Sequence, residues 1–202
     1  MSNQYFENNE KLISNIQTIK YYFQKNTMYF DTDNGVFSKG GIDYGSNVLL
    51  QNITSLNEKK TLLDVGCGYG TMGITLAKKY PNLSVEMIDV NLRALELCNG
   101  NITKNEVKNA FAFESNCYEN VTKKYDVIIS NPPIRAGKKI VFEIIGKAIE
   151  YLNDNGELWI VIQKKQGAES ALKHLKEIYK EVEIVTKDGG YWIITARKKL
   201  VN

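Results

Sequence analysis

Residues 61–77 read TLLDVGCGYGTMGITLA, a short apolar run followed by three glycines and then by an amphipathic stretch. The run from Leu62 to Val65 is typical of a buried strand, and the stretch after Gly70 is typical of a helix. Glycines at such a turn let the backbone approach a bound molecule, and the free N–H groups at a helix start attract a carboxylate or phosphate. Gly66 and Gly68 therefore indicate a ligand-binding turn, although a tight connection alone would have the same composition.

Beyond this turn, short apolar runs rich in β-branched residues alternate with amphipathic runs. The predicted strands read SVEMIDV, AFAFE, YDVIISN and GELWIVIQ, and helical patterns separate most of them. Strands that alternate with helices pair in parallel and carry helices on both faces. The last two strands, EIVTK and YWIITARK, are separated only by DGG, which leaves no room for a crossover helix. We therefore predict an α/β fold with a Rossmann-like, doubly wound, seven-stranded sheet, mostly parallel and with an antiparallel C-terminal hairpin.

Before residue 61 the pattern is aromatic and punctuated by glycine. The segment TMYFDTDNGVFS alternates around Asn34-Gly35 and predicts a β-hairpin, and the loop FSKGGIDYGS leads into a helix from about Ser46. We interpret residues 1–60 as an N-terminal extension of hairpin and loop, in the same domain as a core formed by residues 61–202. The extension either closes one end of the sheet as a flap or covers a bound ligand.

The composition of the 202 residues is that of an ordinary globular chain, with 43% hydrophobic and 24% charged residues. The polar N-terminus and the short apolar runs predict neither a signal peptide nor a membrane span. Three cysteines without C-x-x-C spacing and a single histidine, His174, predict no disulfide framework and no metal site, and favour a reducing, cytoplasmic location. The net charge of +3 and the scattered lysine pairs are typical of solvated helix ends and are compatible with RNA binding.

Two acidic residues lie at the ends of predicted strands near the glycine turn. Asp64 precedes the turn, where a carboxylate would repel a pyrophosphate but would hold the ammonium group of a ligand, directly or through water. Asp89 either accepts hydrogen bonds from both hydroxyls of a ribose or, like Asn91, caps the next helix. Val90 is placed to pack under an adenine, and Asn116 either reads the adenine amino group or belongs to a simple turn.

A nicotinamide dinucleotide is the competing ligand, since Gly68, Gly70 and Gly73 satisfy the fingerprint G-x-G-x-x-G. In that fingerprint the first glycine makes the turn off the strand, whereas here Gly66 already holds that place and Gly73 falls inside the helix. The register fits D-x-G-x-G-x-G better, and an NAD-binding dehydrogenase is the less favoured alternative. An ammonium-binding carboxylate, a ribose clamp and an adenine pocket without a phosphate cradle together describe S-adenosylmethionine.

The stretch Thr61–Lys138 resembles the core of the class I methyltransferases, and the antiparallel last strand is similar to theirs. The resemblance implies that the fourth strand ends at the methyl donor, so that Asn131-Pro132-Pro133-Ile134 faces it. An exocyclic amine is a poor nucleophile because its lone pair is delocalised, and two acceptors, the Asn131 side-chain oxygen and the Pro132 carbonyl, would localise that pair. Proline fixes the direction of the carbonyl and has no N–H that would compete with the amine. Because the sulfonium supplies the driving force and the protein supplies the alignment, the transfer requires no general base. The alternative is a purely structural role, in which Asn-Pro-Pro only terminates the strand.

The segments NPPIRAGK and GVFSKGGIDYGS resemble more narrowly the RsmC-like family, the guanine-N2 methyltransferases of small-subunit rRNA, over about Asn34 to Lys199. That resemblance implies an S-adenosylmethionine-dependent enzyme with rRNA or the small ribosomal subunit as its partner. The protein itself is expected to be a monomer or weak homodimer. The resemblance also implies that Asn131 and Pro132 hold the amine and that Phe37, Ser38 and Lys39 lie over the site. The cofactor-binding residues are then Asp64, Gly66, Cys67 (through its backbone), Gly68, Gly70, Asp89, Val90, Asn116 and Asn131.

Two features depart from that family. Ile134 follows the second proline where many amine methyltransferases carry an aromatic residue that stacks on the base, so either Phe37 or another aromatic replaces it or the substrate is held differently. The bacterial rRNA enzyme has a duplicated, two-domain chain, and here a single domain is expected. Arg135 and Lys138 either grip a phosphate near the target nucleotide or point to solvent from a helix start.

Two further functions stay open at this point. A protein glutamine-amide methyltransferase would use Asn-Pro-Pro equally well, because the amide of glutamine is also planar. A donor-binding scaffold without catalysis would have the same fold, and Asn131 would then be dispensable for its function.

Overall fold

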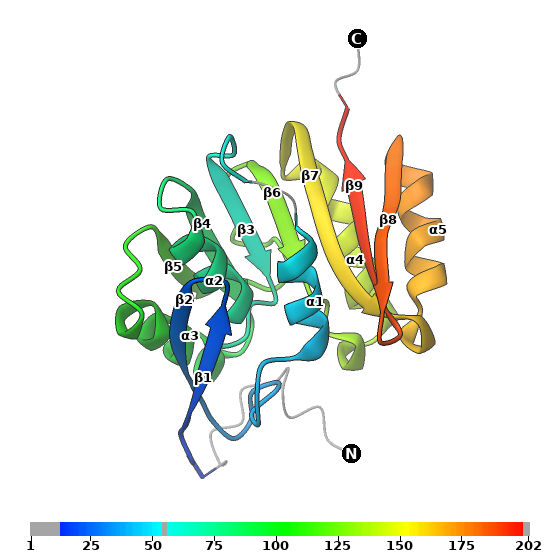
Figure 1. Ribbon diagram of the computed structural model, residues 1–202. Helices are drawn as coiled ribbons and strands as arrows, with labels where there is room; N and C mark the ends of the chain where they lie inside the picture. The colour runs from blue at the N-terminus through cyan, green and yellow to red at the C-terminus, as the bar shows by residue number, and fades with distance from the viewer. Residues whose placement is uncertain (1–12, 54–55, 200–202) are drawn as a thin grey trace.

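The computed structural model describes residues 13–53 and 56–199, which form a seven-stranded sheet with helices on both faces and a separate two-stranded hairpin (Figure 1). The hairpin consists of β1 (Gln17–Phe23) and β2 (Asn26–Thr32). The strands of the large sheet are β3 (Thr61–Val65), β4 (Ser84–Asp89), β5 (Ala110–Glu114), β6 (Tyr125–Ser130), β7 (Leu152–Gln163), β8 (Glu181–Asp188) and β9 (Tyr191–Arg197). The helices are α1 (Tyr44–Asn52), α2 (Thr71–Lys79), α3 (Leu92–Lys104), α4 (Lys138–Lys147) and α5 (Ala168–Ile178), with short 3₁₀ turns η1 (Ile134–Ala136), η2 (Ala148–Glu150) and η3 (Lys164–Gln166).

The strand order of the large sheet is β5-β4-β3-β6-β7-β9-β8. The first five strands of this sheet pair in parallel, while β9 pairs antiparallel with both β7 and β8. The β8–β9 turn at Gly189 and Gly190 has φ of +54° and +81°, a pair of left-handed values that favours glycine at both positions. The predicted fold class, including the antiparallel C-terminal hairpin, is confirmed.

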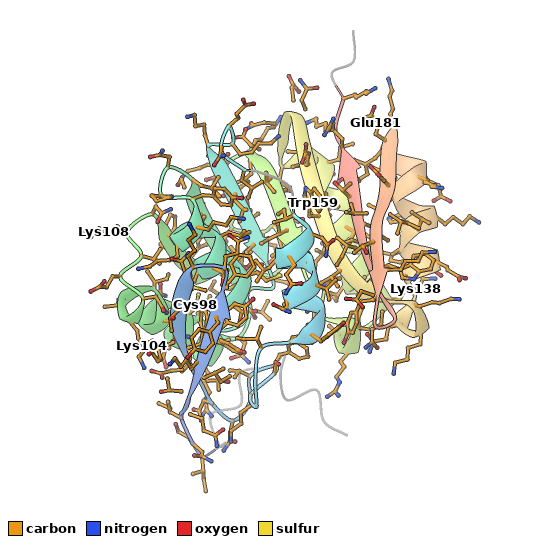
Figure 2. The ribbon with its side chains drawn as sticks, in the orientation of Figure 1. Cys98, Lys104, Lys108, Lys138, Trp159 and Glu181 are labelled. Carbon is orange, nitrogen blue, oxygen red and sulfur yellow. The ribbon has the colours of Figure 1, made fainter. Side chains whose placement is uncertain are left out.

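Two layers of helix enclose the sheet, each over its own apolar core (Figure 1). Helices α1, α2 and α3 pack together with the hairpin on one face, whereas α4 and α5 pack on the other. Cys98 and Trp159, both labelled in Figure 2, belong to the first core, on the side of the hairpin. The parallel strands β3, β4 and β6 are buried on both faces, which explains why their sequences are almost continuously apolar.

An N-terminal hairpin is present as predicted, but the prediction of its turn at Asn34-Gly35 and of a second strand after that turn is wrong. β2 pairs with the strand that precedes it, and the two-residue turn between Phe23 and Asn26 contains Gln24 at a φ of +54°. The Asn34-Gly35 pair instead turns the chain away from the end of β2, where the Asp33 carboxylate accepts the Asn34 N–H. The Asn-Gly pair is the stronger turn signal in the sequence, but the seven-residue alternation of Gln17–Phe23 determined the pairing.

Asn101 of α3 and Asn105, the C-cap of this helix, attach the hairpin to the rest of the fold. The Asn101 side chain bonds both the N–H and the carbonyl of Asp31, at 2.7 and 3.0 Å. Asn105 bonds the N–H and the carbonyl of Tyr29 in the same way, at 2.9 and 2.7 Å. The outer edge of β2 is therefore paired with side-chain amides in place of another strand. Because Asn101 also donates to the Tyr69 carbonyl at 2.9 Å, the hairpin is linked to the glycine turn.

Candidate active site

A cleft of about 450 Å³ opens at the edge of the sheet where β3, β4 and β6 end. Parallel sheets bind ligands at this edge, and the volume is within the usual range for a small-molecule site. Most of the residues predicted from the sequence line this cleft: Phe37, Ser38, Gly66, Cys67, Gly68, Asp89, Val90, Asn116, Asn131, Pro132, Pro133, Ile134 and Arg135. Asp64, Gly70, Lys39 and Lys138 are not among its lining residues.

The glycine turn has positive φ angles, which residues other than glycine rarely adopt. Gly66, Gly68 and Gly70 have φ of +73°, +56° and +95°. The Gly66 and Cys67 N–H groups donate to the Ile88 carbonyl at 2.9 and 3.0 Å, which fixes the turn against the end of β4. A Cβ on Gly70 would lie 2.6 Å from the Cys98 sulfur, whereas one on Gly68 would meet nothing within 4 Å. Gly70 therefore serves close packing, while Gly68 leaves space at the cleft.

Asp64 lies beneath the turn and is fully buried. Its Oδ2 accepts the Gly73 N–H at 2.9 Å, while its Oδ1 has no hydrogen-bond partner among the described residues. Burial raises the pKa of Asp64 to about 7, with the Gly73 N–H acting in the opposite direction and the charge of Asp89 adding to the rise. A buried carboxylate with one unpaired oxygen is costly, so this oxygen is suited to a cationic or hydrogen-donating ligand group.

Asp89 ends β4 and connects this strand to the glycine turn. Its Oδ2 accepts the Gly68 N–H at 2.8 Å and its Oδ1 accepts the Asn91 N–H at 2.9 Å. Burial raises the pKa of Asp89, and these backbone donors lower it in part. Asn91, not Asp89, caps α3, because its side chain accepts the Ala94 N–H at 3.1 Å. Asp89 therefore keeps its remaining acceptor capacity for the cleft.

Two other positions on the cofactor side of the cleft are accounted for by local contacts. The Asn116 amide donates to Glu119 at 3.0 Å, and the Asn116 side chain is exposed at the rim. The Cys67 thiol is buried, and burial together with the neighbouring Cys98 raises the pKa of Cys67 well above its usual value. A thiol in that state stays protonated and is a poor nucleophile.

The Asn-Pro-Pro stretch follows β6 on the opposite side of the glycine turn. Ser130 donates to the Val65 carbonyl at 2.8 Å and so connects the ends of β6 and β3. The Asn131 amide nitrogen donates to Asp43 Oδ2 at 2.8 Å and to Ser46 Oγ at 3.0 Å. The chain then turns, since the Pro133 carbonyl accepts the Ala136 N–H at 2.9 Å in η1. Asn131 is thus held by residues far from it in the sequence.

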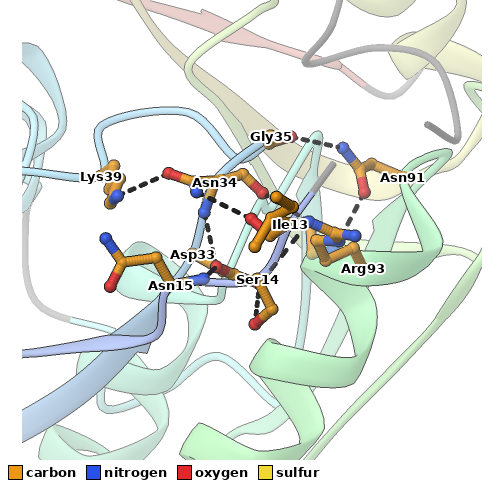
Figure 3. A network of polar contacts seen from close by, with 10 residues as sticks. Ile13, Ser14, Asn15, Asp33, Asn34, Gly35, Lys39, Asn91 and Arg93 are labelled. Carbon is orange, nitrogen blue, oxygen red and sulfur yellow. Dashed lines mark hydrogen bonds and ion pairs between the residues drawn. The ribbon is translucent and has the colours of Figure 1, made fainter. Parts of the chain in front are cut away.

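The loop between β2 and α1 contributes Val36, Phe37 and Ser38 to the lining of the cleft. Polar contacts anchor this loop at several points (Figure 3). Asn91 donates to the Gly35 carbonyl at 3.0 Å, and Arg93 donates to the Asn34 carbonyl at 3.1 Å. The Lys39 ammonium bonds the Asn34 side-chain oxygen at 2.5 Å, which explains why Lys39 does not line the cleft. Phe37 remains 49% exposed at the rim. This placement favours the covering role for the loop over that of a flap at the end of the sheet.

Tyr191, at the start of β9, is an aromatic lining residue for which the sequence interpretation assigned no role. Because β9 is antiparallel, its first residue pairs with Gln163 at the end of β7 and reaches the same edge as the cleft. The Tyr191 ring lies 5.7 Å from the Tyr44 ring, centre to centre. A Cβ on Gly45 would lie 2.7 Å from the Tyr191 ring, so the absence of a side chain there allows the close approach.

Two basic or titratable residues named from the sequence lie outside the cleft. The Lys138 ammonium lies 4.9 Å from the centre of the Phe142 ring. His174 of α5 stacks on the same Phe142 ring, which belongs to α4, at a centre-to-centre distance of 4.6 Å. Within residues 13–53 and 56–199, no group of three His, Cys, Asp or Glu side chains gathers as a metal site would require, and no helix is long and apolar enough to cross a membrane.

Known proteins resemble this chain in sequence and in fold. The family model for the methyltransferase small domain matches residues 27–195. The uncharacterized protein YbxB of Bacillus subtilis is 44% identical over 98% of this chain and 100% of its own length. Ribosomal RNA small subunit methyltransferase C of Buchnera aphidicola subsp. Baizongia pistaciae is 34% identical over 86% of this chain, which spans only 54% of that relative.

A solved structure with the same fold is the T. thermophilus 16S rRNA N2 G1207 methyltransferase (RsmC) in complex with AdoMet and guanosine. Its TM-score is 0.80 at 23% identity, over 91% of this chain and 51% of that one. The chain therefore spans about half the length of the rRNA methyltransferases it matches.

Proposed function

The chain belongs to the family of the methyltransferase small domain, and from that membership we propose that it methylates the exocyclic N2 amine of guanine in small-subunit rRNA. The membership, together with the relatives named as rRNA methyltransferases, confirms the expectation of an S-adenosylmethionine-dependent methyltransferase. The guanine target and the rRNA partner are the proposed part. The names of relatives that are about twice as long support them.

We infer two contacts with S-adenosylmethionine. The unpaired Oδ1 of Asp64, which lies beneath the glycine turn and not in the lining of the cleft, is suited to the ammonium group of the methionine part, directly or through water. Asp89, which does line the cleft, is suited to two ribose hydroxyls. The open space at Gly68 gives room for the ligand beside the turn. When bound, S-adenosylmethionine supplies an electrophilic methyl group on a sulfonium centre. The chain itself supplies the alignment of this group with the acceptor.

The observation that carries the proposal is the position of Asn131 and Pro132 in the same cleft as the glycine turn and Asp89. With its nitrogen directed at Asp43 and Ser46, the Asn131 amide has its oxygen left to accept an N–H of the target amine. The Pro132 carbonyl is the second acceptor proposed for this amine. Two acceptors draw the amine toward a tetrahedral shape, which localises its lone pair for attack on the methyl group, and the proton leaves afterwards.

The base itself is proposed to lie against the apolar rim of the cleft. Ile134 contributes from η1, and the aromatic rings of Phe37 and Tyr191 face the same opening. Arg135 lines the cleft and is the cation proposed to contact a phosphate or stack on a base. These contacts fit a nucleotide taken out of a helix, because a paired guanine has its N2 amine at the hydrogen-bonded edge.

The test is mass spectrometry of nucleosides from rRNA incubated with the protein and labelled S-adenosylmethionine. Naked rRNA, assembled small subunits and ribosomal protein fractions are offered separately, and Asn131→Ala is the inactive control. We expect label in N2-methylguanosine from one of the RNA substrates, and about 10²-fold to 10³-fold less with Asn131→Ala. Label only in protein would support glutamine-amide methylation, and label in neither fraction would refute the proposed acceptor.

A further inference from the structure

Asp43 lies far from Asn131 in the sequence, yet its carboxylate accepts a hydrogen bond from the Asn131 side-chain amide. Its Oδ2 accepts the Asn131 Nδ2 at 2.8 Å and the Ser46 N–H at 2.8 Å. The second bond makes Asp43 the N-cap of α1. The partial positive charge at this helix start favours a carboxylate at this place. Asp43 and Asn131 thus meet at the rim of the cleft, and both side chains line it.

A carboxylate fixes which way the Asn131 amide points. An ionised carboxylate only accepts hydrogen bonds, so it must face the amide nitrogen and never the amide oxygen. Ser46 lacks this selectivity, because its hydroxyl, 3.0 Å from the same nitrogen, is able to donate as well as accept. Without Asp43, rotation of the amide by half a turn would present an NH₂ group to the acceptor amine, and two donors repel each other.

We propose that Asp43 is a positioning residue for methyl transfer, which holds the Asn131 amide with its oxygen toward the acceptor amine. The identity of that amine rests on the function proposed above, while the orientation of the amide does not. The Asp43 side chain contacts Asn131 and the start of α1, so its effect on the reaction is assigned to Asn131. The expected loss is in the rate of transfer rather than in binding of the donor.

The test compares Asp43→Ser with a matched control elsewhere in the sheet. Serine is a good N-cap residue, so this variant keeps the cap of α1 while its shorter side chain loses the contact with Asn131. The control is Asp126→Ser, because the Asp126 carboxylate also accepts both a side-chain amide, that of Asn153, and backbone N–H groups, those of Lys60 and Thr61, where Asp43 accepts one backbone N–H. Asp126 lies at the start of β6, outside the residues that line the cleft.

For Asp43→Ser we expect kcat to fall about 10-fold to 100-fold, with the Kd of S-adenosylhomocysteine changed less than about twofold. Asp126→Ser should lower the unfolding temperature and leave kcat unchanged. In an Asn131→Ala background, Asp43→Ser should lower kcat by less than about threefold, because the residue through which it acts is gone. Losses that multiply in the double variant would overturn the proposal.

A measurement that does not depend on the methyl acceptor tests the role of Asp43 even if the proposed function is wrong. The Asn131 side-chain amide protons are followed by NMR on ¹⁵N-labelled protein, with the signal assigned by its loss in Asn131→Ala. We expect slow exchange with solvent in the wild type and faster exchange in Asp43→Ser, even if no RNA is methylated. Equal protection in both proteins would overturn the positioning role. If Asp43→Ser does not fold, Asp43→Asn replaces it in every arm, with a kcat loss of about 2-fold to 10-fold expected because its amide fits either orientation of Asn131.

Discussion

Binding of the donor is expected to depend on pH through Asp64. Because burial raises the pKa of Asp64 to about 7, this side chain is protonated in the free protein at mildly acidic pH. An ammonium ligand requires the ionised form, so binding must release the proton of Asp64 below that pH. Asp89, whose pKa is also raised by burial, acts in the same direction when it accepts ribose hydroxyls.

The magnitude follows from the ionised fraction of Asp64. With a pKa of about 7, that fraction rises about 15-fold between pH 5.5 and pH 7, and the affinity for S-adenosylhomocysteine should rise by a similar factor. Above about pH 8 the affinity should fall again, because the α-amino group of the ligand loses its own proton. The same titration acts on stability with the opposite sign. A folded-state pKa raised from 3.8 to about 7 lowers the free energy of unfolding by up to about 4 kcal/mol as the pH rises through that interval.

The assay is isothermal titration calorimetry with S-adenosylhomocysteine at pH 5.5, 6 and 7, each in two buffers of different protonation enthalpy. At pH 6 we expect release of about 0.9 proton from Asp64 for each ligand bound. Asp64→Asn keeps an oxygen for the Gly73 N–H but carries no proton to release, so it should bind more weakly at pH 7 and depend less on pH. Equal affinity at pH 5.5 and 7 with no proton release in the wild type would refute the reasoning.

Three further predictions concern packing and specificity. Gly73→Ala should lower the free energy of unfolding in urea by about 1 to 3 kcal/mol, since its Cβ would lie 2.4 Å from the Met87 sulfur; an unchanged midpoint would contradict this overpacking. Asn101→Ala should cost about 3 kcal/mol in the same assay, because it leaves two partly buried backbone groups of Asp31 in β2 and the buried Tyr69 carbonyl of the glycine turn unpaired; a cost below that of the exposed Asn99→Ala would show that these bonds are unimportant. Ile134→Phe should lower KM for the RNA about tenfold through added stacking, with the Kd of S-adenosylhomocysteine unchanged; an unchanged KM would place the base elsewhere.

The fold was largely predictable because its signals are local. Each parallel strand is a short apolar run, and the DGG turn between β8 and β9 is too short for anything other than an antiparallel pair. The turn of the N-terminal hairpin was not predictable from its local signal, because Asn34-Gly35 favours a turn more strongly than Gln24-Lys25 does. The partner of β2 was decided instead by the alternation of β1 and by packing against α3.

The candidate site was predictable where its residues follow strands. Gly66, Asp89 and Asn131 each come directly after or at the end of a strand, so the topology alone brings them to one edge. Asp43 and Tyr191 were missed because their place depends on how the extension and the last strand return to that edge. The stretch IDYGS did contain a signal, since Asp is a preferred N-cap residue and Asp43 directly precedes α1, but it gave no indication that the same carboxylate would reach Asn131.

The position of β9 between β7 and β8 affects the order in which the strands of the large sheet can pair during folding. During synthesis the glycine turn and β4 are made well before the last hairpin, with β5, β6 and β7 in between. Because β8 pairs only with β9 in the large sheet, β8 has no partner there until β9 has paired with β7. The residues assigned to the donor are thus all synthesised before Tyr191, the lining residue that β9 adds to the cleft. A folding intermediate that lacks the last hairpin therefore lacks this aromatic wall, and it also lacks the apolar side chains that β9 adds to both cores.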